Sequence, residues 1–401
     1  MQIATGLSIK KDPILAAKEA ITAARLELRS EKIDLAIVFS SINLSSSILL
    51  ETINLSLEET VPIIGCSGAA VISNQGIFIQ GVVILLLSLS SGEYLNTACV
   101  QDIKTKTALN AGRELGEKLL YAFKDVRRVL SVIFSDGLMD EGSNLILGLQ
   151  ERLGTSFPLA GASAADNLRF LKSHVYFNKE LFSDGAVGIL LGGKFNFGLG
   201  IKHGWKPIGK PRTVTRSQGN IVWEIDSEPA VKIYEKYLAC RVSELQKELK
   251  RISILYPIGM YLPGEEEYLL RNILSIGKDG SLRFQGNVFQ GSLIRLMIGT
   301  KESCLAATRQ AVEEAQKNLS GQVSESKKMN NFVLVFDSVS RYMLLKRGAA
   351  KELQIIKETM GENTPIIGLY TYGEQAPLMA VSYAGQSYFH NQTIAILNIA
   401  G

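Results

Sequence analysis

Side chains that could do chemistry lie beside glycines at the ends of short apolar runs. The clearest case is TPIIGLYTYGEQAP, residues 364–377, in which Tyr370, Tyr372 and Glu374 surround Gly373. Such a stretch could form a catalytic turn, a ligand cradle or a tight structural corner. We favour the cradle, because glycine lets the backbone approach a ligand, tyrosines offer apolar walls with hydroxyl groups, and glutamate supplies charge.

A second stretch, GCSGA at residues 65–69, resembles the GxSxG turn of serine hydrolases, with alanine in place of the last glycine. That motif requires a strand–turn–helix context, whereas the VISNQGIF that follows predicts a strand. The simpler interpretation is a tight turn in which Cys66 is an inert buried thiol. We therefore predict that the protein is not an enzyme, with a hydrolase built on Ser67 as a weaker alternative.

The histidine and cysteine patterns give no metal site from sequence alone. His174, His203 and His390 are far apart, and no HExxH, EF-hand or Walker A motif is present. The four cysteines are widely spaced and include no CxxC pair. This pattern argues against a zinc ribbon or a disulfide scaffold and is typical of a reducing compartment. We therefore expect a cytoplasmic protein without a metal site.

The composition is that of a globular protein large enough for two domains. The 401 residues are 46% hydrophobic and 20% charged, with a formal net charge of +4. No concentrated cationic face for nucleic acid is expected, and the lysines of 10–20 and 247–251 are interpreted as solvent-facing helix positions. The most apolar window, residues 81–91, is too short to cross a bilayer and predicts a buried strand. The N-terminus has no signal-peptide pattern, so neither membrane nor nucleic acid is expected as a partner.

Three segments, at residues 35–71, 130–167 and 332–374, repeat one pattern. Each has an apolar strand ending in small polar residues, an amphipathic helix, and a strand of the form Pro-apolar-apolar-Gly. Short β-like segments and another apolar strand follow. Strands that are apolar on both faces are typical of sheets covered on both sides. The predicted fold is a two-domain α/β protein, with mixed β-sheets flanked by helices and built from repeated strand–helix–strand–hairpin units.

The region from 196 to 320 follows another pattern. Its alternation and its turns at glycine and proline predict β-hairpins, and a long helix closes the region before a glycine at 321. We therefore expect three parts: a strand and helix in 1–30, an N-terminal domain in 31–220 and a C-terminal domain in 221–401.

Polar residues mark the predicted strand ends, where open α/β sheets bind ligands. The first strands of the three segments end in Ser40–Ser41, Ser135–Asp136 and Asp337–Ser338, and the glycine strands carry Cys66–Ser67, Ser163 and Tyr370–Glu374. Alternatively, Asp136 and Ser338 only cap the helices that follow them.

Two arginines, Arg271 and Arg295, stand inside apolar strand patterns. An arginine on an inward face needs a partner, because an unpaired buried charge is strongly unfavourable. Glu374 is the expected partner of Arg271, or the two clamp a zwitterion, with the arginine on a carboxylate and the glutamate on an ammonium group. Outward-facing or salt-bridged arginines are the alternative.

Taken together, these blocks resemble the FIST sensory family in both its N-terminal and C-terminal domains. The resemblance rests on PIIGCSGAAV (62–71), SDGL with PLAGASAADN (135–138, 158–167), HGWKPIG with TVTRSQGNIVWEIDSEPAVKIYEKYL (203–209, 213–238), YPIGM with YLLRNIL (256–260, 267–273), GSLRFQGNVFQGSLIRLM (280–297), and IIGLYTYGE with FHNQTIAIL (366–374, 389–397). It implies a cytoplasmic sensory module for a small ligand, often proposed to be amino-acid-like, that works with histidine kinases, methyl-accepting proteins or cyclic-dinucleotide enzymes. Because no output domain is evident, we expect a stand-alone sensor that signals through a separate partner.

Some relatives bind haem and sense nitric oxide with a histidine kinase as partner, so a haem-binding sensor is the alternative. A haem needs an axial histidine or cysteine in an apolar pocket. His203, His390 and Cys66 are the candidate ligands.

Two positions depart from the family pattern. Ala70 stands near the place where the glycine–cysteine–serine turn usually continues to an acidic residue. In the family, the apolar strand that opens the third segment (332–374) often ends in a cysteine, and here Asp337 or Ser338 stands at that place. If those groups touch ligand in relatives, the ligand of this protein differs. The residues expected to bind ligand are Cys66, Ser67, Ser163, Arg271, Tyr370, Tyr372 and Glu374.

Overall fold

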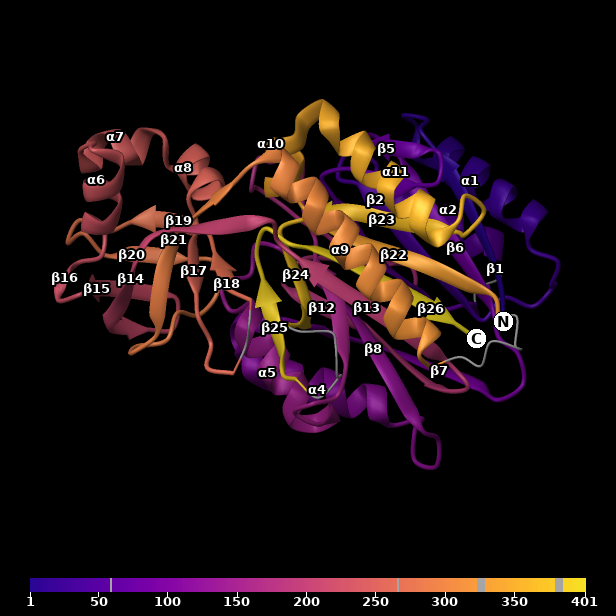
Figure 1. The fold of residues 1–401 in the computed structure, drawn as a ribbon. Helices are drawn as coiled ribbons and strands as arrows, with labels where there is room; N and C mark the ends of the chain where they lie inside the picture. The colour runs from indigo at the N-terminus through magenta and orange to yellow at the C-terminus, as the bar shows by residue number, and fades with distance from the viewer. Residues whose placement is uncertain (58–59, 265–266, 323–328, 379–384) are drawn as a thin grey trace.

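The computed structural model describes residues 1–401 except 58–59, 265–266, 323–328 and 379–384. Its described strands form three six-stranded sheets and one eight-stranded sheet (Figure 1). The expected α/β class with mixed sheets flanked by helices is confirmed. No described helix has the length and apolar character needed to cross a membrane.

Three stretches of chain share one order of elements, and we call them units 1, 2 and 3. Unit 1 contains β1 (Gln2–Ser8), α1 (Pro13–Glu27), β2 (Leu35–Ser41), α2 (Ser47–Leu57), β3 (Ile63–Gly68), the hairpin β4 (Val71–Ser73) and β5 (Gly76–Phe78), and β6 (Val82–Ser88). Unit 2 contains β7 (Glu93–Gln101), α3 (Ile103–Lys106), α4 (Ala108–Leu120), β8 (Arg128–Ser135), α5 (Gly142–Leu153), β9 (Leu159–Ser163), the hairpin β10 (Val175–Phe177) and β11 (Glu180–Phe182), and β12 (Gly185–Gly193). Unit 3 contains β13 (Asn196–Lys202), α9 (Lys301–Ser320), β22 (Asn331–Ser338), α10 (Val339–Leu345), the 3-10 helix η1 (Lys346–Gly348), α11 (Ala349–Met360), β23 (Ile366–Thr371), the hairpin β24 (Gly373–Pro377) and β25 (Ser387–His390), and β26 (Ile394–Ala400).

The units exchange their hairpins in a cycle. In each unit the two strands around the middle helix are parallel, as β2–β3, β8–β9 and β22–β23. The second strand of each pair then accepts the hairpin of another unit: β3 pairs with β10, β9 with β24, and β23 with β4. Each six-stranded sheet therefore contains strands from two units, and the pairs β9–β24 and β23–β4 link residues more than 200 positions apart in the chain.

The glycine of the Pro-apolar-apolar-Gly pattern permits this close strand packing. A Cβ at Gly65, Gly161 or Gly368 would lie 1.8, 2.0 or 2.1 Å from a carbonyl oxygen of the neighbouring parallel strand. Contacts that short do not occur between real atoms, so no larger residue fits without moving the backbone.

The three sheets pack their inner faces together, and helix pairs cover their outer faces. At the centre, Phe39 of β2, Phe134 of β8 and Phe336 of β22 meet edge to face, with ring centroids 5.2, 5.8 and 6.3 Å apart. The helix pairs α1–α2, α4–α5 and α9–α11 each form a separate outer core with one sheet. Both faces of β2, β8 and β22 are therefore buried, which explains their continuous apolar sequence.

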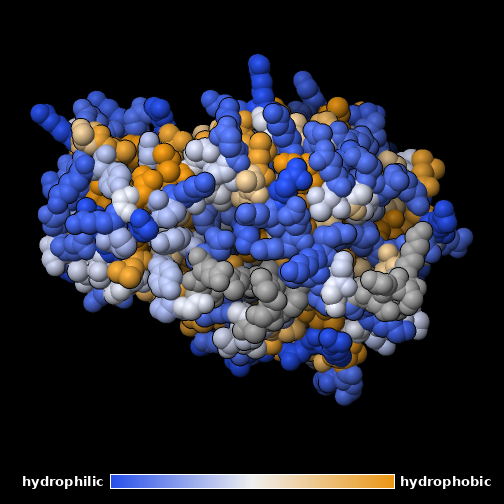
Figure 2. All heavy atoms as spheres, viewed as in Figure 1, coloured by the Kyte–Doolittle hydropathy of each residue, from blue (hydrophilic) through white to orange (hydrophobic). Residues whose placement is uncertain are grey.

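Between β13 and α9, the chain leaves unit 3 and folds into a separate part, called the insertion below. It contains β14 (Trp205–Gln218), β15 (Ile221–Ile225), β16 (Glu228–Pro229), α6 (Lys232–Leu238), α7 (Val242–Lys247), α8 (Leu249–Leu255), β17 (Ile258–Met260), β18 (Leu269–Arg271), β19 (Ile273–Ile276), β20 (Leu282–Phe284) and β21 (Leu293–Gly299). The insertion lies at the left of Figure 1 and has its own hydrophobic core. In Figure 2, hydrophilic residues cover most of the visible surface, and hydrophobic residues show among the insertion helices at the left.

Candidate functional site

The expected polar strand ends do meet, but they form closed hydrogen-bonded layers. Ser163 Oγ lies 3.1 Å from Ser135 Oγ and accepts a hydrogen bond of 2.9 Å from Gln375 Nε2. Ser40 Oγ lies 2.8 Å from the hydroxyl of Tyr176, which occupies the corresponding hairpin position in its sheet. All five side chains are buried, so these layers hold the exchanged hairpins in place.

The GCSGA segment continues as strand β3 and offers no activated nucleophile. Ser67 Oγ donates to the carbonyl of Ala165 and accepts from the amide of His174, at 2.9 and 3.0 Å. Cys66 is fully buried in the central core, and this burial raises the pKa of its thiol. Ser67 therefore ties β3 to unit 2, and Cys66 stays a neutral thiol.

The expected ion pair between Arg271 and Glu374 is wrong. Arg271 is buried, but its guanidinium donates to the backbone carbonyls of Asn287, Leu270 and Phe389, each at 2.9 Å. Burial without a carboxylate lowers the pKa of Arg271 to about 9. Carbonyl oxygens accept its N–H donors but do not neutralise its charge, and the sequence does not reveal such partners.

Glu374 belongs to a different set of contacts. Its carboxyl group accepts hydrogen bonds from the hydroxyls of Thr371 and Thr393 and from the amide of Thr393. Burial raises the pKa of Glu374 to about 8, although these hydrogen bonds oppose the shift. The clamp for a zwitterion that we expected from Arg271 and Glu374 is therefore not assembled.

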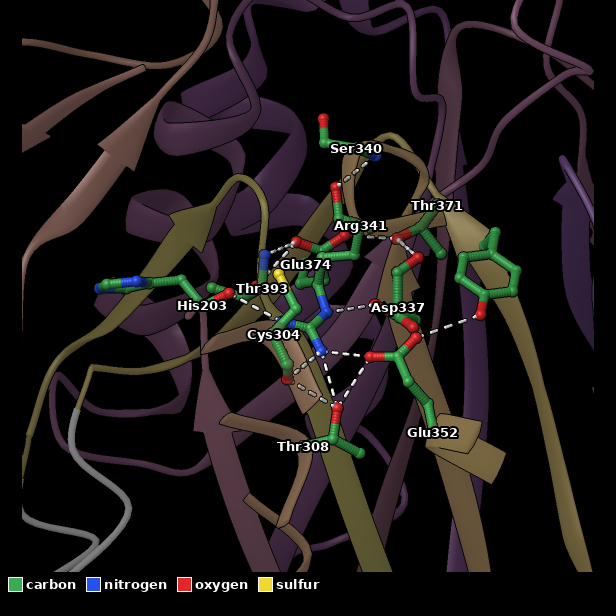
Figure 3. A network of polar contacts seen from close by, with 12 residues as sticks. His203, Cys304, Thr308, Asp337, Ser340, Arg341, Glu352, Thr371, Glu374 and Thr393 are labelled. Carbon is green, nitrogen blue, oxygen red and sulfur yellow. Dashed lines mark hydrogen bonds and ion pairs between the residues drawn. The ribbon is translucent and has the colours of Figure 1, made fainter. Parts of the chain in front are cut away.

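A buried charged network centred on Arg341 lies beside Glu374 (Figure 3). The guanidinium forms ion pairs with Asp337 and Glu352 and donates to the hydroxyl of Thr308. Burial lowers the pKa of Arg341, but Glu352 and Asp337 outweigh it and the net shift is upward. Burial and the nearby Glu352 raise the pKa of Asp337 well above its usual value, against the effect of Arg341. Arg341, the arginine of the FDSVSR segment, therefore links α10 to the end of β22 through Asp337 and to α11 through Glu352.

The two tyrosines of YTYGE point into different environments. The Tyr370 hydroxyl donates to Glu352 at 3.4 Å, so Tyr370 belongs to the Arg341 network. The Tyr372 hydroxyl donates to Asp166, and its ring stacks on Phe170 with centroids 4.3 Å apart. Of the residues expected to bind ligand, Tyr372 is the one that lines a large pocket.

This pocket, called the α8 pocket, lies between the insertion and units 2 and 3. Its volume is about 560 Å³, within the usual size of small-molecule sites. Units 2 and 3 contribute Gly137, Leu138, Met139, Asp140, Leu168, Phe170, Val339, Ser340, Met343 and Tyr372. The insertion contributes Gln246, Lys247, Leu249, Lys250, Ser253, Ile254, Asn272, Ile273, Leu274 and Gln285.

Asp166 shapes the aromatic wall of the α8 pocket. Its carboxylate accepts four hydrogen bonds from the amides of residues 169–172, in addition to the bond from Tyr372. Burial raises the pKa of Asp166, but Tyr372 and these amides outweigh it and the net shift is downward. Leu168 and Phe170 adopt left-handed φ angles of 68° and 56°. Such conformations are unfavourable unless the surroundings impose them, so the carboxylate fixes this loop.

The histidines do not form a haem site in this arrangement. His203 Nδ1 accepts from the amide of Trp205, and His390 Nε2 lies 3.0 Å from the carbonyl oxygen of Ala376. Burial lowers the pKa of His390 to about 3. Both rings line a cavity of about 10 Å³, which is room for a single water. Among the described residues, then, these histidines do not fit a porphyrin, and no group of three His, Cys, Asp or Glu side chains is placed to hold a metal ion.

Several pocket residues were missed from the sequence. Lys247 and Lys250 are solvent-exposed, as the sequence predicts, and both also lie at the α8 pocket, which the sequence does not indicate. The sequence signal that could have indicated this region was the pair Phe170 and Leu171, two large apolar residues shortly after the ASAADN block. Both are exposed, and no core pattern required them.

Comparisons with known proteins identify the family. A family profile described as the FIST N domain matches residues 34–228, and one described as the FIST C domain matches residues 230–377. The chain therefore belongs to the FIST family, whose domains are associated with sensory signal transduction.

The relatives found by sequence are described as uncharacterized proteins and therefore suggest no activity. An uncharacterized protein of Mycobacterium tuberculosis H37Rv is 23% identical over 406 residues, covering 99% of both chains. An uncharacterized protein of Methanocaldococcus jannaschii is 22% identical over 313 residues, which are 73% of this chain and 57% of that protein. The chain thus matches little more than half the length of that relative. A cyanuric acid hydrolase from A. caulinodans aligns with a TM-score of 0.41 at 8% identity, covering 100% of this chain and 99% of its own.

Proposed function

We propose that this protein is a stand-alone cytoplasmic sensor that binds a small, amino-acid-like ligand in the α8 pocket. The observation that carries the proposal is the pocket itself, which is built jointly by the insertion and by units 2 and 3. A ligand that touches both parts binds best when they are held at one distance, so occupancy favours one arrangement of the insertion.

The chemistry of the pocket favours binding over catalysis. Its described lining includes no cysteine and no histidine. Its one carboxylate, Asp140, is paired with Arg283 at 2.5 Å. The Cys–His and Ser–His pairs that commonly activate a nucleophile therefore cannot form within this lining.

In this proposal the output passes through a second protein. The association of FIST domains with sensory signal transduction supports a signalling partner, such as a histidine kinase or a cyclic-dinucleotide enzyme. We place the partner contact on the insertion, because the pocket links its position to ligand binding. The haem-based alternative draws no support from the surroundings of His203 and His390.

Thermal unfolding with a library of amino acids and related acids tests the proposal. A ligand at a hundred times its Kd stabilises the folded state by about 2.7 kcal/mol, which raises the Tm by several degrees. Leu274→Trp fills the pocket and should abolish the shift, whereas Leu293→Trp, an equally exposed leucine outside the pocket, should keep it. The proposal fails if no compound raises the Tm, or if Leu274→Trp responds like the unchanged protein.

A further inference from the structure

The charges at the α8 pocket are unequal. Two ammonium groups, of Lys247 and Lys250, face one carboxylate, that of Asp140, which Arg283 already neutralises. In the ranges that the structure describes, neither lysine forms an ion pair with a carboxylate. The pocket therefore presents net positive charge to a ligand.

Lys250 connects α8 to the loop that carries Leu168 and Phe170, at one side of the α8 pocket. Its Nζ donates a 2.6 Å hydrogen bond from α8 to the carbonyl of Leu168 and lies 4.9 Å from the centre of the Phe170 ring. An ammonium group has three N–H donors, so two remain for a ligand. Because the residue is exposed, a ligand anion can reach the ammonium without displacing core side chains.

The described lining offers no unpaired carboxylate to a ligand ammonium, because Asp140 is paired with Arg283. Asn272 Oδ1 already accepts from Gln392, and Gln285 Oε1 accepts from Asn272 Nδ2 at 3.4 Å. A buried cation without a carboxylate partner is strongly unfavourable. An amino group on the ligand would thus lose its hydration and gain no equivalent partner.

The rest of the lining suits an apolar body. Leu138, Met139, Ile254, Ile273, Leu274 and Met343 contribute aliphatic or thioether surface. The Phe170–Tyr372 stack adds a flat aromatic wall. Burial of an apolar group against such walls contributes most of the binding free energy of small ligands.

We infer that the ligand is a carboxylate on an aromatic or branched apolar body and that it lacks an ammonium group, as in arylalkanoic acids or 2-oxo acids with such side chains. This inference rests on the proposed function, since it names the ligand class of the same pocket. The ligand keeps the carbon skeleton of an amino acid, and Lys250 binds its carboxylate. The deaminated acid therefore binds more tightly than the amino acid.

Four probes that share one phenyl group test the inference by calorimetric titration: 3-phenylpropanoate, 3-phenylpropanamide, L-phenylalanine and 2-phenylethylamine. Hydrogen bonds to a charged group contribute about 1.5–3 kcal/mol, so the acid should bind at least about tenfold more tightly than the amide. L-Phenylalanine should bind more weakly than the acid, and the amine should show no binding. Added salt should weaken the binding of the acid and leave the binding of the amide unchanged.

Charge variants assign the effect to Lys250. Lys250→Met should bring the acid-to-amide ratio close to one, Lys250→Arg should restore part of it, and Lys351→Met, an exposed lysine of α11, should leave it unchanged. This ratio is not affected by a general change in pocket shape, which would weaken acid and amide alike. The unliganded Tm of each variant reports whether it folds.

The outcomes separate this inference from the proposed function. If the amide, the amine or L-phenylalanine binds as tightly as the acid, the inference is overturned while a pocket ligand still stands. If Lys250→Met keeps the ratio, the assignment to Lys250 is overturned. If neither the probes nor the wider library binds, the proposed function fails as well.

Discussion

Arg341 Nη1 lies 2.7 Å from the carbonyl oxygen of His203, the residue that follows β13 where the chain enters the insertion. Nη2 of the same guanidinium lies 3.0 Å from the carbonyl oxygen of Cys304, just after the chain returns into α9. One buried side chain therefore holds both connections of the insertion to unit 3 (Figure 3). The helix that carries it also presents Val339, Ser340 and Met343 to the α8 pocket.

Replacement of Arg341 by methionine should destabilise the protein by about 3–5 kcal/mol, because Asp337 and Glu352 would lose their buried cation. Urea unfolding at neutral pH measures this loss. Arg309→Met, at an exposed position of α9, should stay within about 0.5 kcal/mol of the unchanged protein. A loss below about 1 kcal/mol for Arg341→Met would show that the network contributes little to holding the insertion.

Glu374 should make stability fall as pH rises. Burial raises the pKa of its carboxyl group to about 8 in the folded protein, whereas the ordinary value of an unfolded glutamate is about 4.3. Between these pKa values the folded state holds a proton that the unfolded state has released. The contribution is therefore fully present below the unfolded pKa and is lost as pH rises toward 8, with a slope of up to about 1.4 kcal/mol per pH unit.

Glu374→Gln isolates this effect, because the amide has no proton to release. The difference in unfolding free energy between the unchanged protein and the variant should decline from pH 5 to pH 8. Glu313→Gln, at an exposed helix position, should give a constant difference. A pH-independent difference for Glu374→Gln would mean that its carboxyl group is already ionised in the folded state at pH 5.

Asp166→Ala should damage the α8 pocket more than it damages the fold. The loop of residues 169–172 would lose four hydrogen bonds from its amides to the carboxylate, and Leu168 and Phe170 would relax from their left-handed conformations. We expect the binding of 3-phenylpropanoate to weaken at least about tenfold, with a loss of about 1–3 kcal/mol in stability. Phe170→Ala, on a half-exposed ring, should weaken binding with less than about 1 kcal/mol change in stability. Unchanged affinity in both variants would exclude this wall from the site.

The sequence was sufficient to predict the strands and helices of the three units, but not the exchange of hairpins between them. Apolar runs ending in Ser40, Ser135 and Asp337 identify three buried strands, because strands covered on both faces have no polar alternation. The pairing of β24 with β9 could not be foreseen, since hairpins of this length carry no signal for which sheet they join. The partners of Arg271 were also beyond reach, because three carbonyl oxygens leave no trace in side-chain pattern. Lys250 is exposed as expected, but its place at the α8 pocket could not be foreseen, because a lysine beside a pocket has the same sequence pattern as any lysine on a helix surface.

Alkylation of the folded protein should distinguish two classes of cysteine. Cys66 and Cys304 are buried, and burial raises the pKa of both thiols, that of Cys304 to about 11. The thiolate is the reactive form, so both should resist N-ethylmaleimide until the protein unfolds, whereas Cys99 and Cys240 are partly exposed and should react. Mass spectrometry of peptides labelled before and after urea treatment measures this order. Rapid labelling of Cys66 in the folded protein would contradict its place in the central core, and would return the GCSGA segment to consideration as a reactive or ligand-binding turn.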